Sequence, residues 1–424
     1  MKNKLKVIFV KGVAGSGKTT ELRKRTAELV KDYPKDEIQV VSFTREAAAH
    51  IGKELGVKSS TVHAMGYSLG GFSSGDVVSE DELKILDPDV IERESRKKAR
   101  GEQSQGSYQS YLKERGKIDF NDMIDHKAVF HGLKVLIVDE SQDMTPLQHK
   151  FISNIAKDLE VLVMAGDPNQ CIYSFGEAVA DFDDEVSSQL KRLGVDFISE
   201  EVILDKSYRV PEVIADFVRD KILTHVTKHS AIYGVGSGGF LKNKPSKIVT
   251  DFDVDVIIVR TNWQANAIAE QAIEAGFPVR RSKHALSVDS PQFFAWVNWD
   301  TYRAGVLEAD EAEKIRRVLV VDAKDRESAL GLEPRESYLY MKLERAHVKK
   351  DPVDVMTIHG VKGLEYDRVA FVCDFVGKSF ADSKVEQARL CYVACTRAKK
   401  SLAVYTGSSK VLAPHRPRGY YSKR

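Results

Sequence analysis

Residues 12–19 read "GVAGSGKT" and match the pattern G-x-x-x-x-G-K-[ST]. An apolar run, Lys6–Val10, leads into this loop, and residues with a helical pattern follow it. Glycines let such a loop curl so that its backbone N–H groups point at phosphate oxygens. The loop therefore predicts that a nucleoside triphosphate binds here, with the Lys18 ammonium beside the β- and γ-phosphates and the Thr19 hydroxyl on Mg²⁺. The residues expected to hold the nucleotide are Gly12, Ala14, Gly15, Ser16, Gly17, Lys18, Thr19 and Thr20.

A second acidic motif lies further along the chain, where residues 134–144 read "KVLIVDESQDM". Asp139 and Glu140 come at the carboxyl end of this apolar run, and ligands of open α/β sheets bind at that end of the strands. We expect Asp139 to hold Mg²⁺ and Glu140 to polarise the water that attacks the γ-phosphate. Taken alone, Asp139 and Glu140 could equally be two solvated acids at a strand end. Together with the glycine loop, they favour hydrolysis of the nucleotide over phosphoryl transfer by a kinase, which would not need a second carboxylate as base.

Short apolar runs alternate with helical patterns along the chain, and such runs are typical of parallel strands buried on both faces. The alternation predicts an α/β fold with parallel sheets. Because four runs precede residue 170 and three follow residue 250, we expect two α/β domains. The runs are Lys6–Val10, Ile38–Phe43, Val135–Asp139, Leu159–Ala165, Asp255–Val259, Val353–Ile358 and Val369–Val372.

Two segments interrupt this rhythm and are interpreted as short, mostly helical insertions. The first spans residues 64–117 and is polar, and the second spans residues 281–351 and is mixed in character. Between the two domains, residues 204–222 are expected to form a connector that leads into a helix after Pro211. The expected first domain comprises residues 1–63 and 118–203, the second residues 204–280 and 352–410, and a basic tail residues 411–424.

The composition is that of a globular protein. The chain has 424 residues, 42% of them hydrophobic, and 64 Lys+Arg against 62 Asp+Glu give a net charge of +2, so any basic surface must be local. Four cysteines are too few for a disulfide scaffold and suggest buried thiols in a reducing compartment. No apolar stretch approaches the roughly 20 residues of a membrane-spanning helix. We expect a soluble, cytoplasmic monomer that does not contact a membrane.

The order of further motifs resembles that of the UvrD/Rep type of superfamily 1 DNA helicase. The segment "VDESQD" after the glycine loop resembles motif II of that family, and similar segments run in the family's order from residue 6 to about residue 402. They are Val40–Ile51 (motif Ia), Ser60–Met65 (T-x-H), Ile118–Ile124 (D-F-x-D), Met164–Ala178 (motif III), Leu204–Arg209 (motif IV), Val355–Val372 (motif V) and Glu386–Leu402 (motif VI). The resemblance implies two tandem RecA-like P-loop NTPase domains with ATP in the cleft between them.

The resemblance also implies roles around the nucleotide. Gln170 would contact the γ-phosphate and sense its loss. Arg209 and Arg397 would stabilise the transition state from the second domain, since a guanidinium fork can hold two phosphate oxygens at once. Tyr208 would stack on the adenine, and Glu365 would bind the ribose. In isolation, either arginine could equally lie in an exposed surface loop.

For nucleic acid, Phe43 and Tyr173 are the expected stacking residues, followed by Phe175, because base–aromatic stacking tolerates any sequence. Phe43 and Tyr173 could instead be ordinary core aromatics, and His63 a loop histidine with a protein partner. The basic stretch Arg93–Arg100 suits a DNA backbone or a solvated helix face. The expected phosphate contacts are Thr44, His63, Thr357 and His359.

Taken together, the motifs predict an ATP- and Mg²⁺-dependent single-stranded DNA translocase or helicase that couples hydrolysis to stepping, with the 3′→5′ polarity that the family implies. Its partners would be single-stranded DNA or a 3′-tailed duplex, and a protein that loads it in replication or repair. The alternative is a nucleotide-gated DNA clamp or regulatory ATPase that does not unwind by itself. Phe175 replaces the usual tryptophan of motif III without a following arginine, and the insertions are short, and both features favour the clamp. A P-loop kinase or small-molecule transferase would leave motifs V and VI unexplained.

Overall fold

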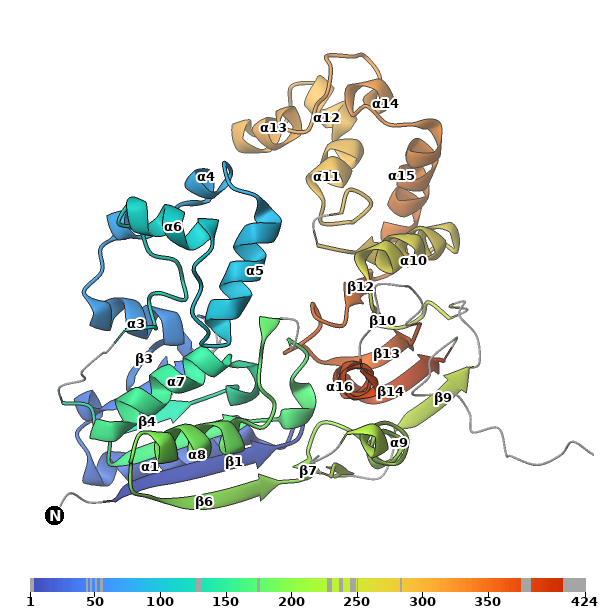
Figure 1. Cartoon of the computed structure of the whole chain (residues 1–424). Coiled ribbons are helices and arrows are strands. Elements are labelled where there is room, and N and C mark those ends of the chain that lie inside the picture. Colours follow the sequence, from blue (N-terminus) through green and yellow to red (C-terminus); the bar gives the residue numbers. More distant parts are fainter. Residues whose placement is uncertain are drawn as a thin grey trace, which may run out of the picture. The chain divides into compact units, whose positions relative to one another are not determined.

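The structure is a computed structural model, and it divides into two compact units (Figure 1). The first comprises Met1–Tyr208 and Val226–Val235, and the second Arg209–His225 and Gly236–Arg424. The residues described are 4–42, 45, 48–49, 52–53, 56–126, 132–173, 176–226, 231–235, 239–244, 249, 251–282, 284–374 and 383–406.

The first unit is built on a six-stranded sheet in which every neighbouring pair is parallel. In spatial order its strands are β3 (Lys58–Thr61), β2 (Ile38–Ser42), β4 (Val135–Val138), β5 (Val161–Gly166), β1 (Leu5–Gly12) and β6 (Phe197–Leu204). Since all six run the same way, their carboxyl ends meet at one edge. The glycine loop and the acidic motif follow two of these ends.

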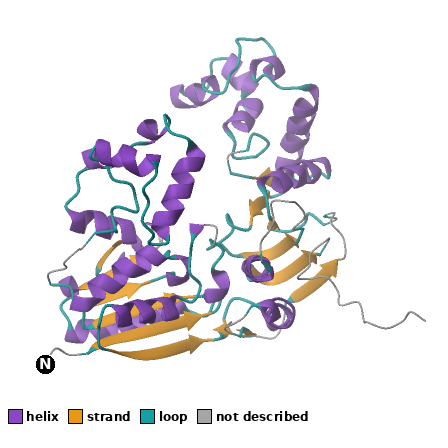
Figure 2. Cartoon of the chain, viewed as in Figure 1, coloured by secondary structure: helices purple, strands orange, loops and turns teal. Residues whose placement is uncertain are grey.

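Helices cover both faces of this sheet (Figure 2). One face packs against α3 (Val62–Gly70), α7 (Pro146–Ile155) and α8 (Phe182–Arg192), and the other against α1 (Lys18–Asp32). Successive residues of β1 point to opposite faces of the sheet, with Val7 and Phe9 on one face and Ile8 and Val10 on the other. Because both faces are buried, the strand is apolar at every one of these positions, which explains the continuous apolar runs in the sequence.

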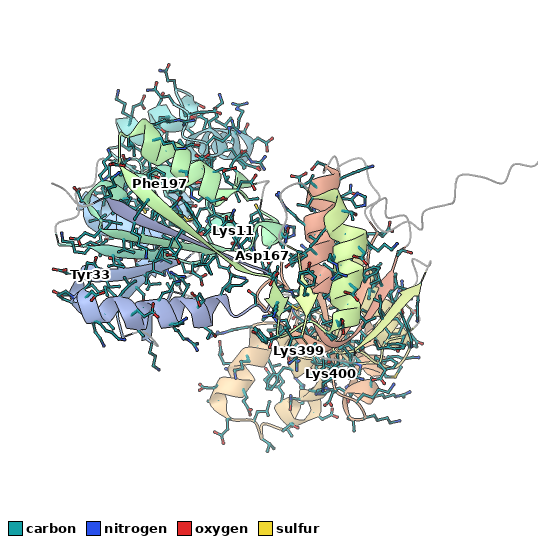
Figure 3. The ribbon with its side chains drawn as sticks, turned by 90° about the horizontal axis from the view of Figure 1, so that it is seen from below. Lys11, Tyr33, Asp167, Phe197, Lys399 and Lys400 are labelled. Atoms are coloured by element: carbon teal, nitrogen blue, oxygen red, sulfur yellow. The ribbon has the colours of Figure 1, made fainter. Side chains whose placement is uncertain are left out.

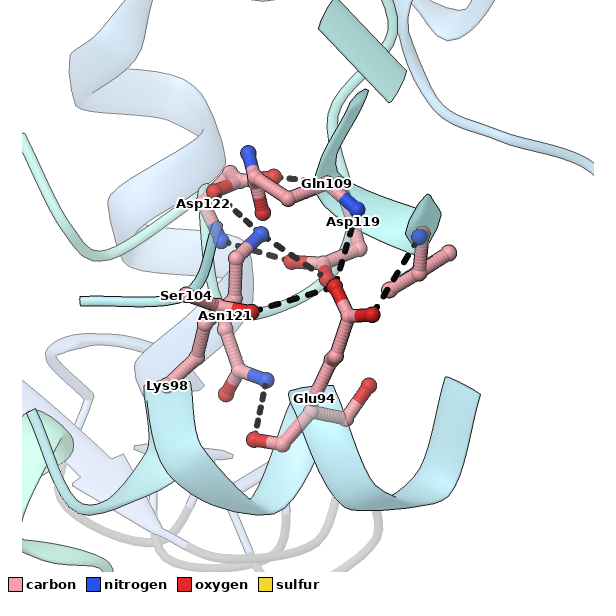
Figure 4. A network of polar contacts seen from close by, with 9 residues as sticks. Glu94, Lys98, Ser104, Gln109, Asp119, Asn121 and Asp122 are labelled. Carbon is pink, nitrogen blue, oxygen red and sulfur yellow. Dashed lines mark hydrogen bonds and ion pairs between the residues drawn. The ribbon is translucent and has the colours of Figure 1, made fainter. Parts of the chain in front are cut away.

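A small helical region interrupts the first unit after α3, with α4 (Glu80–Leu83), α5 (Pro88–Ala99) and α6 (Ser107–Glu114) around a cluster of Tyr108, Tyr111 and Leu112. The Glu94 carboxylate of α5 is buried and accepts hydrogen bonds from Ser104 Oγ at 3.1 Å and from the backbone N–H of Gln109 at 3.0 Å (Figure 4). These bonds satisfy the charge and fasten the loop before α6 to α5.

The same helix is tied to the "IDFNDMI" segment by an ion cluster that Figure 4 also shows. Lys98 Nζ lies 3.1 Å from Asp119 Oδ2 and 2.7 Å from Asp122 Oδ1. Burial and the neighbouring charge of Asp119 raise the pKa of Asp122. Lys98 therefore serves as the counter-ion of the buried Asp119 and the half-buried Asp122, and this part of the basic stretch is structural.

The second unit repeats the parallel α/β plan. Its sheet has the order β11 (Val279–Arg280), β12 (Val353–Thr357), β10 (Val256–Val259), β13 (Tyr366–Val372), β14 (Ala398–Tyr405) and β9 (Phe240–Lys244). All neighbouring pairs are parallel. Its helices include α9 (Glu212–Phe217), α10 (Asn262–Glu274) and α16 (Lys384–Cys395). The predicted α/β class with parallel sheets is confirmed, as is the helix after Pro211.

Between β11 and β12 the described residues form five helices, which belong to the core of the second unit. They are α11 (Pro291–Val297), α12 (Trp299–Arg303), α13 (Ala309–Arg316), α14 (Arg326–Ala329) and α15 (Pro334–His347). Trp296 stacks on Tyr340 with ring centroids 5.4 Å apart, and both rings join the cluster that contains Ile257 and Val355 of the sheet. This helical stretch thus shares one hydrophobic core with the sheet.

Shorter elements complete the described chain. A two-stranded sheet pairs β7 (Lys206–Ser207) with β8 (Tyr233–Gly234) in the first unit. A π-helical turn, Val218–Ile222, continues α9. The 3₁₀ turns are Lys35–Glu37, Ser74–Asp76, Ser141–Asp143, Ala156–Asp158, Pro168–Gln170 and Leu223–His225.

The four cysteines, Cys171, Cys373, Cys391 and Cys395, are buried thiols that form no disulfide within the described chain, as the composition predicts. Burial raises the pKa of the Cys391 and Cys395 thiols, which keeps them protonated. Among the helices of the described chain, none combines the length and the apolar character required to cross a membrane.

Candidate functional site

The glycine loop connects β1 to α1 at the carboxyl edge of the first sheet. Gly15 has a φ of 70° and Gly17 a φ of 83°, a left-handed conformation that side chains other than glycine rarely adopt. Lys18 begins α1, and its Nζ donates hydrogen bonds to the carbonyl oxygens of Gly12 at 3.0 Å and Val13 at 3.4 Å. The ammonium is thus held at the mouth of the loop.

Two observations indicate that this loop fits a phosphate group. A Cβ atom on Gly12 would lie 2.5 Å from Lys18 Cγ and 2.6 Å from Ser16 Oγ, so only glycine leaves room for the lysine to fold over the loop. Ser16 Oγ is buried, and none of the described residues forms a hydrogen bond with it. A buried hydroxyl without a protein partner is costly, and a phosphate oxygen would satisfy it.

The glycine loop is also anchored to the segment that ends the first unit. Val13 N–H donates to Leu204 O at 3.0 Å, Ser207 Oγ donates to Ala14 O at 2.7 Å, and Tyr208 N–H donates to Gly15 O at 2.9 Å. The Tyr208 side chain remains 72% exposed. The structure therefore brings Tyr208 beside the phosphate loop with its ring free to meet a planar group.

Asp139 and Glu140 directly follow β4, and the structure brings Asp139 and Lys18 into one electrostatic site. Burial, followed by the negative charge of Glu140, raises the pKa of Asp139 to about 7, while the Lys18 ammonium acts in the opposite direction. A bound Mg²⁺ would favour the Asp139 carboxylate in the same way as Lys18 does. The proximity of Lys18 and Asp139 matches the arrangement expected for a Mg²⁺–nucleotide site.

Glu140 has an unusual backbone conformation. Its φ is 53°, in the left-handed region, although it is not glycine. Such a conformation costs of order 1–3 kcal/mol and is found preferentially at functional sites. The Glu140 N–H donates to Asp139 Oδ1 at 2.9 Å, which fixes the Asp139 carboxylate against the backbone of Glu140.

A chain of hydrogen bonds connects Glu140 with Gln170. Gln142 Nε2 donates to Glu140 Oε2 at 2.7 Å and to Asp143 Oδ2 at 3.1 Å, and Gln142 Oε1 accepts the Asp167 N–H at 2.9 Å. Asp167 Oδ2 in turn accepts Gln170 Nε2 at 2.8 Å. Gln142 and Asp167 were not predicted as site residues. Their only signal in the sequence is their position inside "DESQD" and "GDPNQ".

Figure 3 shows Asp167, a member of this network, at one end of the first sheet. Lys11 and Asp167 lie together at the carboxyl ends of β1 and β5, where Lys11 pairs in register with Gly166. Phe197, the first residue of β6, lies toward the other end of the sheet. The phosphate loop, the acidic pair and Gln170 thus share a single edge.

Of the predicted nucleic-acid contacts in the first unit, Tyr173 and His63 can be placed. Burial and the charges of Asp143 and Glu140 raise the pKa of Tyr173, so its phenol belongs to the surroundings of the acidic network. His63 lies in the first turn of α3, edge-on to the exposed ring of Phe120 with ring centroids 5.7 Å apart, and burial lowers the pKa of His63. Phe43, Thr44 and Phe175 lie outside the described residues.

In the second unit, three predicted nucleotide contacts gather around residues 364–365. Arg209 Nε lies 2.6 Å from Glu365 Oε2. Arg397 is 1% exposed, and its guanidinium donates to the carbonyl oxygens of Val393 at 2.9 Å and Leu364 at 3.2 Å. The pairing of Arg209 with Glu365 was not predicted, because the two residues are far apart in sequence.

Thr357 and His359 lie at the carboxyl edge of the second sheet. Thr357 ends β12, and its Oγ1 accepts the Gly360 N–H at 3.2 Å. His359 Nδ1 lies 3.4 Å from Nη1 of Arg260, which directly follows β10. The structure therefore adds Arg260 to the predicted residues on this edge.

Comparison with known proteins gives two matching family models. One, described as an AAA domain, matches residues 1–176, and the other, described as a UvrD-like helicase C-terminal domain, matches residues 330–409. The first match contains the glycine loop and the acidic pair, and the second contains Thr357, His359, Glu365 and Arg397.

Similar proteins include a probable DNA helicase of Mycoplasma pneumoniae, 21% identical over 317 residues, which are 70% of this chain and 50% of that protein. The ATP-dependent DNA helicase UvrD2 of Mycobacterium bovis is 32% identical over 111 residues, 23% of this chain and 15% of that protein. A solved arterivirus nonstructural protein 10 helicase with DNA has 14% identity and a TM-score of 0.42, over 96% of this chain and 62% of that chain.

The chain spans about half the length of the Mycoplasma relative and less of the mycobacterial one. The two family models nevertheless fall on its two units in the order in which the motifs occur. From its sequence motifs, its parallel α/β units and these matches, the chain belongs to the UvrD/Rep type of superfamily 1 helicases.

Proposed function

We propose that this protein is an ATP- and Mg²⁺-dependent motor that moves along single-stranded DNA in the 3′→5′ direction. The observation that supports it most is the joint site of Lys18 and Asp139, with the Ser16 hydroxyl inside the loop, to which none of the described residues forms a hydrogen bond. A hydrogen-bond chain leads from this site through Glu140 to Gln170.

In this proposal, the backbone of residues 12–20 and the Lys18 ammonium hold the nucleotide phosphates, while Thr19 and Asp139 hold Mg²⁺, which would neutralise charge on the transferred phosphoryl group. Glu140 accepts a proton from the attacking water. Gln142 donates a hydrogen bond to Glu140 Oε2 and so fixes the direction of the carboxylate that would accept this proton.

Arg209 and Arg397 supply positive charge for the transition state. Arg209 is held by Glu365. Nucleotide phosphates would compete for Arg209, which would free the Glu365 carboxylate for a ribose hydroxyl. The exposed Tyr208 ring would stack on the adenine, since its backbone is bonded to the phosphate loop.

Single-stranded DNA would contact the carboxyl edges of both sheets. We propose base stacking by Tyr173, Phe43 and Phe175 and phosphate contacts by Thr44, His63, Thr357 and His359. Burial and the charges of Asp143 and Glu140 raise the pKa of Tyr173, so its ring lies near these carboxylates. A DNA base stacked on Tyr173 would therefore lie close to the hydrolytic network, which supports coupling between stepping and hydrolysis.

The second candidate is a nucleotide-gated DNA clamp that hydrolyses slowly and does not unwind. Its support is the state of Arg397, which is buried and bonded to backbone carbonyls of its own unit. In a clamp, Arg397 would keep these backbone contacts and have only a structural role. In the motor, its guanidinium would have to contact the phosphates of the bound nucleotide.

The two candidates differ in one experiment. We expect single-stranded DNA to stimulate ATP hydrolysis at least tenfold, and a 3′-tailed duplex, but not a 5′-tailed one, to be separated with ATP and Mg²⁺. DNA binding with neither stimulation nor strand separation would favour the clamp. The absence of any DNA binding would contradict both candidates.

A further inference from the structure

Trp263 is the most exposed aromatic side chain among the described residues, at 78%. The other two tryptophans, Trp296 and Trp299, are buried. In the described part of the chain, the Trp263 indole has no hydrogen bond, ring contact or cation–π contact. Isolated exposed apolar residues are common on protein surfaces, so exposure alone does not indicate a role for Trp263. Its position in the fold is the more informative feature.

Trp263 lies on the carboxyl edge of the second sheet, in the first turn of α10. This turn follows β10, whose last residue, Val259, pairs in register with Thr357. Arg260 and His359 lie within 3.4 Å of each other on the same edge. Ligands of parallel α/β sheets bind at this edge.

The turn that carries Trp263 is fixed by side-chain bonds. Thr261 and Gln264 form a capping box, and Gln264 Nε2 donates to the backbone oxygen of Asp374 at 3.0 Å. Arg281 Nη2 lies 3.3 Å from Oδ1 of Asn262, the residue before Trp263. The exposed indole therefore projects from a rigid support, which lowers the entropy cost of using it in binding.

The surface beside this turn carries a positive charge that lacks an acidic partner in the described chain. The Arg281 guanidinium is held by neutral oxygens: Asn266 Oδ1 at 2.9 Å, Asn262 Oδ1 at 3.3 Å and Val355 O at 3.5 Å. The nearby carboxylates of Asp289 and Asp354 are paired with Arg280. An exposed indole next to an uncompensated guanidinium suits a stacked base with its phosphate, rather than an apolar protein surface.

From this geometry we propose that Trp263 stacks on a base of single-stranded DNA, while Arg281 and Arg260 face the adjoining phosphates. The inference rests on the proposed DNA-dependent function and adds a base-stacking position on the second unit. Stacking on an aromatic ring is tolerant of sequence. The site would therefore bind any single strand and would discriminate against duplex, whose bases are already stacked.

The test is the affinity of the full-length protein for a fluorescein-labelled dT oligonucleotide, measured by anisotropy without nucleotide. We expect Trp263→Ala to raise the Kd about 5- to 150-fold, which corresponds to ~1–3 kcal/mol per stacked base, and Trp263→Phe to raise it only a few-fold. The control is Tyr338→Ala, which removes an exposed ring on α15 and should leave the Kd unchanged.

Two further readouts separate stacking from other roles. Trp263→Ala should leave the slope of log Kd against log salt unchanged, because the indole neutralises no phosphate, whereas Arg281→Ala should reduce that slope by about 0.7. In the wild type, the oligonucleotide should quench the exposed indole, and this quenching should be lost in Trp263→Phe.

If wild-type protein binds the oligonucleotide and Trp263→Ala binds it equally well, the stacking inference is wrong and the proposed function stands. An equal loss for blunt duplex and single strand would also overturn the inference. If the wild type does not bind at all, both fail. Unchanged thermal unfolding of the variants checks that each remains folded.

Discussion

The side-chain amide of Gln142 lies 2.7 Å from the carboxylate of Glu140 and donates a hydrogen bond to it. The same amide group accepts the Asp167 N–H through its oxygen. Gln142 therefore links the ends of β4 and β5 through a single side chain. Because Glu140 is held in a strained backbone conformation, its carboxylate direction depends on such a partner.

We expect Gln142→Ala to lower kcat for ATP hydrolysis by about 10- to 100-fold with little change in nucleotide affinity, because a misplaced base impairs only the chemical step. Steady-state ATPase rates and titration with a fluorescent ATP analogue measure the two quantities. Glu140→Gln, which removes the base itself, should cost at least as much. Gln189→Ala, on α8, is the matched control, and normal turnover in Gln142→Ala would show that Glu140 is positioned in another way.

Gly12→Ala should weaken ATP binding at least tenfold. The new methyl group would meet Lys18 Cγ and Ser16 Oγ at 2.5 and 2.6 Å, so either the lysine or the loop must move. Gly75→Ala provides the control, since its Cβ would meet only Ser73 Oγ, at 3.7 Å. The comparison is between nucleotide dissociation constants. Equal affinity in Gly12→Ala and the wild type would contradict a role for the folded-over lysine.

The binding of Mg²⁺ with nucleotide should weaken as the pH falls below about 7, the pKa of Asp139. Burial and Glu140 raise this pKa, so the carboxyl is protonated below it and must lose its proton to bind the metal. We expect the apparent Kd for Mg²⁺ to rise up to about tenfold per pH unit there.

Glu140→Gln removes the neighbouring charge and should shift this profile toward lower pH. Titration of the nucleotide itself affects both proteins equally, so the difference between them reports Asp139. Identical profiles would contradict the coupling of the two carboxyls.

His149 should make the first unit sensitive to acid. The side chain is fully buried in α7, neither ring nitrogen has a hydrogen-bond partner among the described residues, and burial lowers the pKa of His149 to about 3. Below pH 6.5 the His149 imidazole is protonated in the unfolded chain but stays neutral in the folded protein. The free energy of unfolding therefore decreases as the pH falls from 6.5 toward 3. The loss at pH 5 is about 2 kcal/mol relative to pH 8.

His149→Phe should remove this part of the pH dependence. Urea unfolding of both proteins at pH 8 and pH 5 measures it, and comparison of the two differences cancels other titrating groups. If the variant loses as much stability between the two pH values as the wild type, His149 is not the source.

Much of the fold could be predicted, because buried parallel strands leave continuous apolar runs. All seven predicted runs overlap observed strands. The strands that were not predicted lie at or near sheet edges or carry charge. β6 mixes exposed and half-buried residues, and β3 is the polar stretch Lys58–Thr61. In β14, two exposed lysines follow the first residue, Ala398. Such strands form because the backbone of a neighbouring strand pairs with them. The pattern of apolar residues within a short segment does not show which distant segment will be that neighbour.

The candidate site could be predicted in part. Motif spacing identified Lys18, Asp139 and Glu140, because strand ends and a helix start determine where they lie. It could not identify Gln142 or Asp167 as a link, nor the pairing of Arg209 with Glu365, since these contacts depend on side-chain directions across distant segments. Trp263 was missed for a related reason, because exposure cannot be read from the sequence.

The bonds from Ser207 and Tyr208 to the glycine loop have a mechanical consequence. Tyr208 is the last residue of the first unit before the chain crosses, and Arg209 is the first of the second. Any displacement of the loop therefore acts directly on the Tyr208–Arg209 peptide bond, where the chain first passes from one unit to the other, without an intervening helix. Two short hydrogen bonds transmit the displacement from the loop to Ser207 and Tyr208. The Tyr208–Arg209 boundary would therefore respond to a nucleotide in the loop before more distant parts of the molecule do.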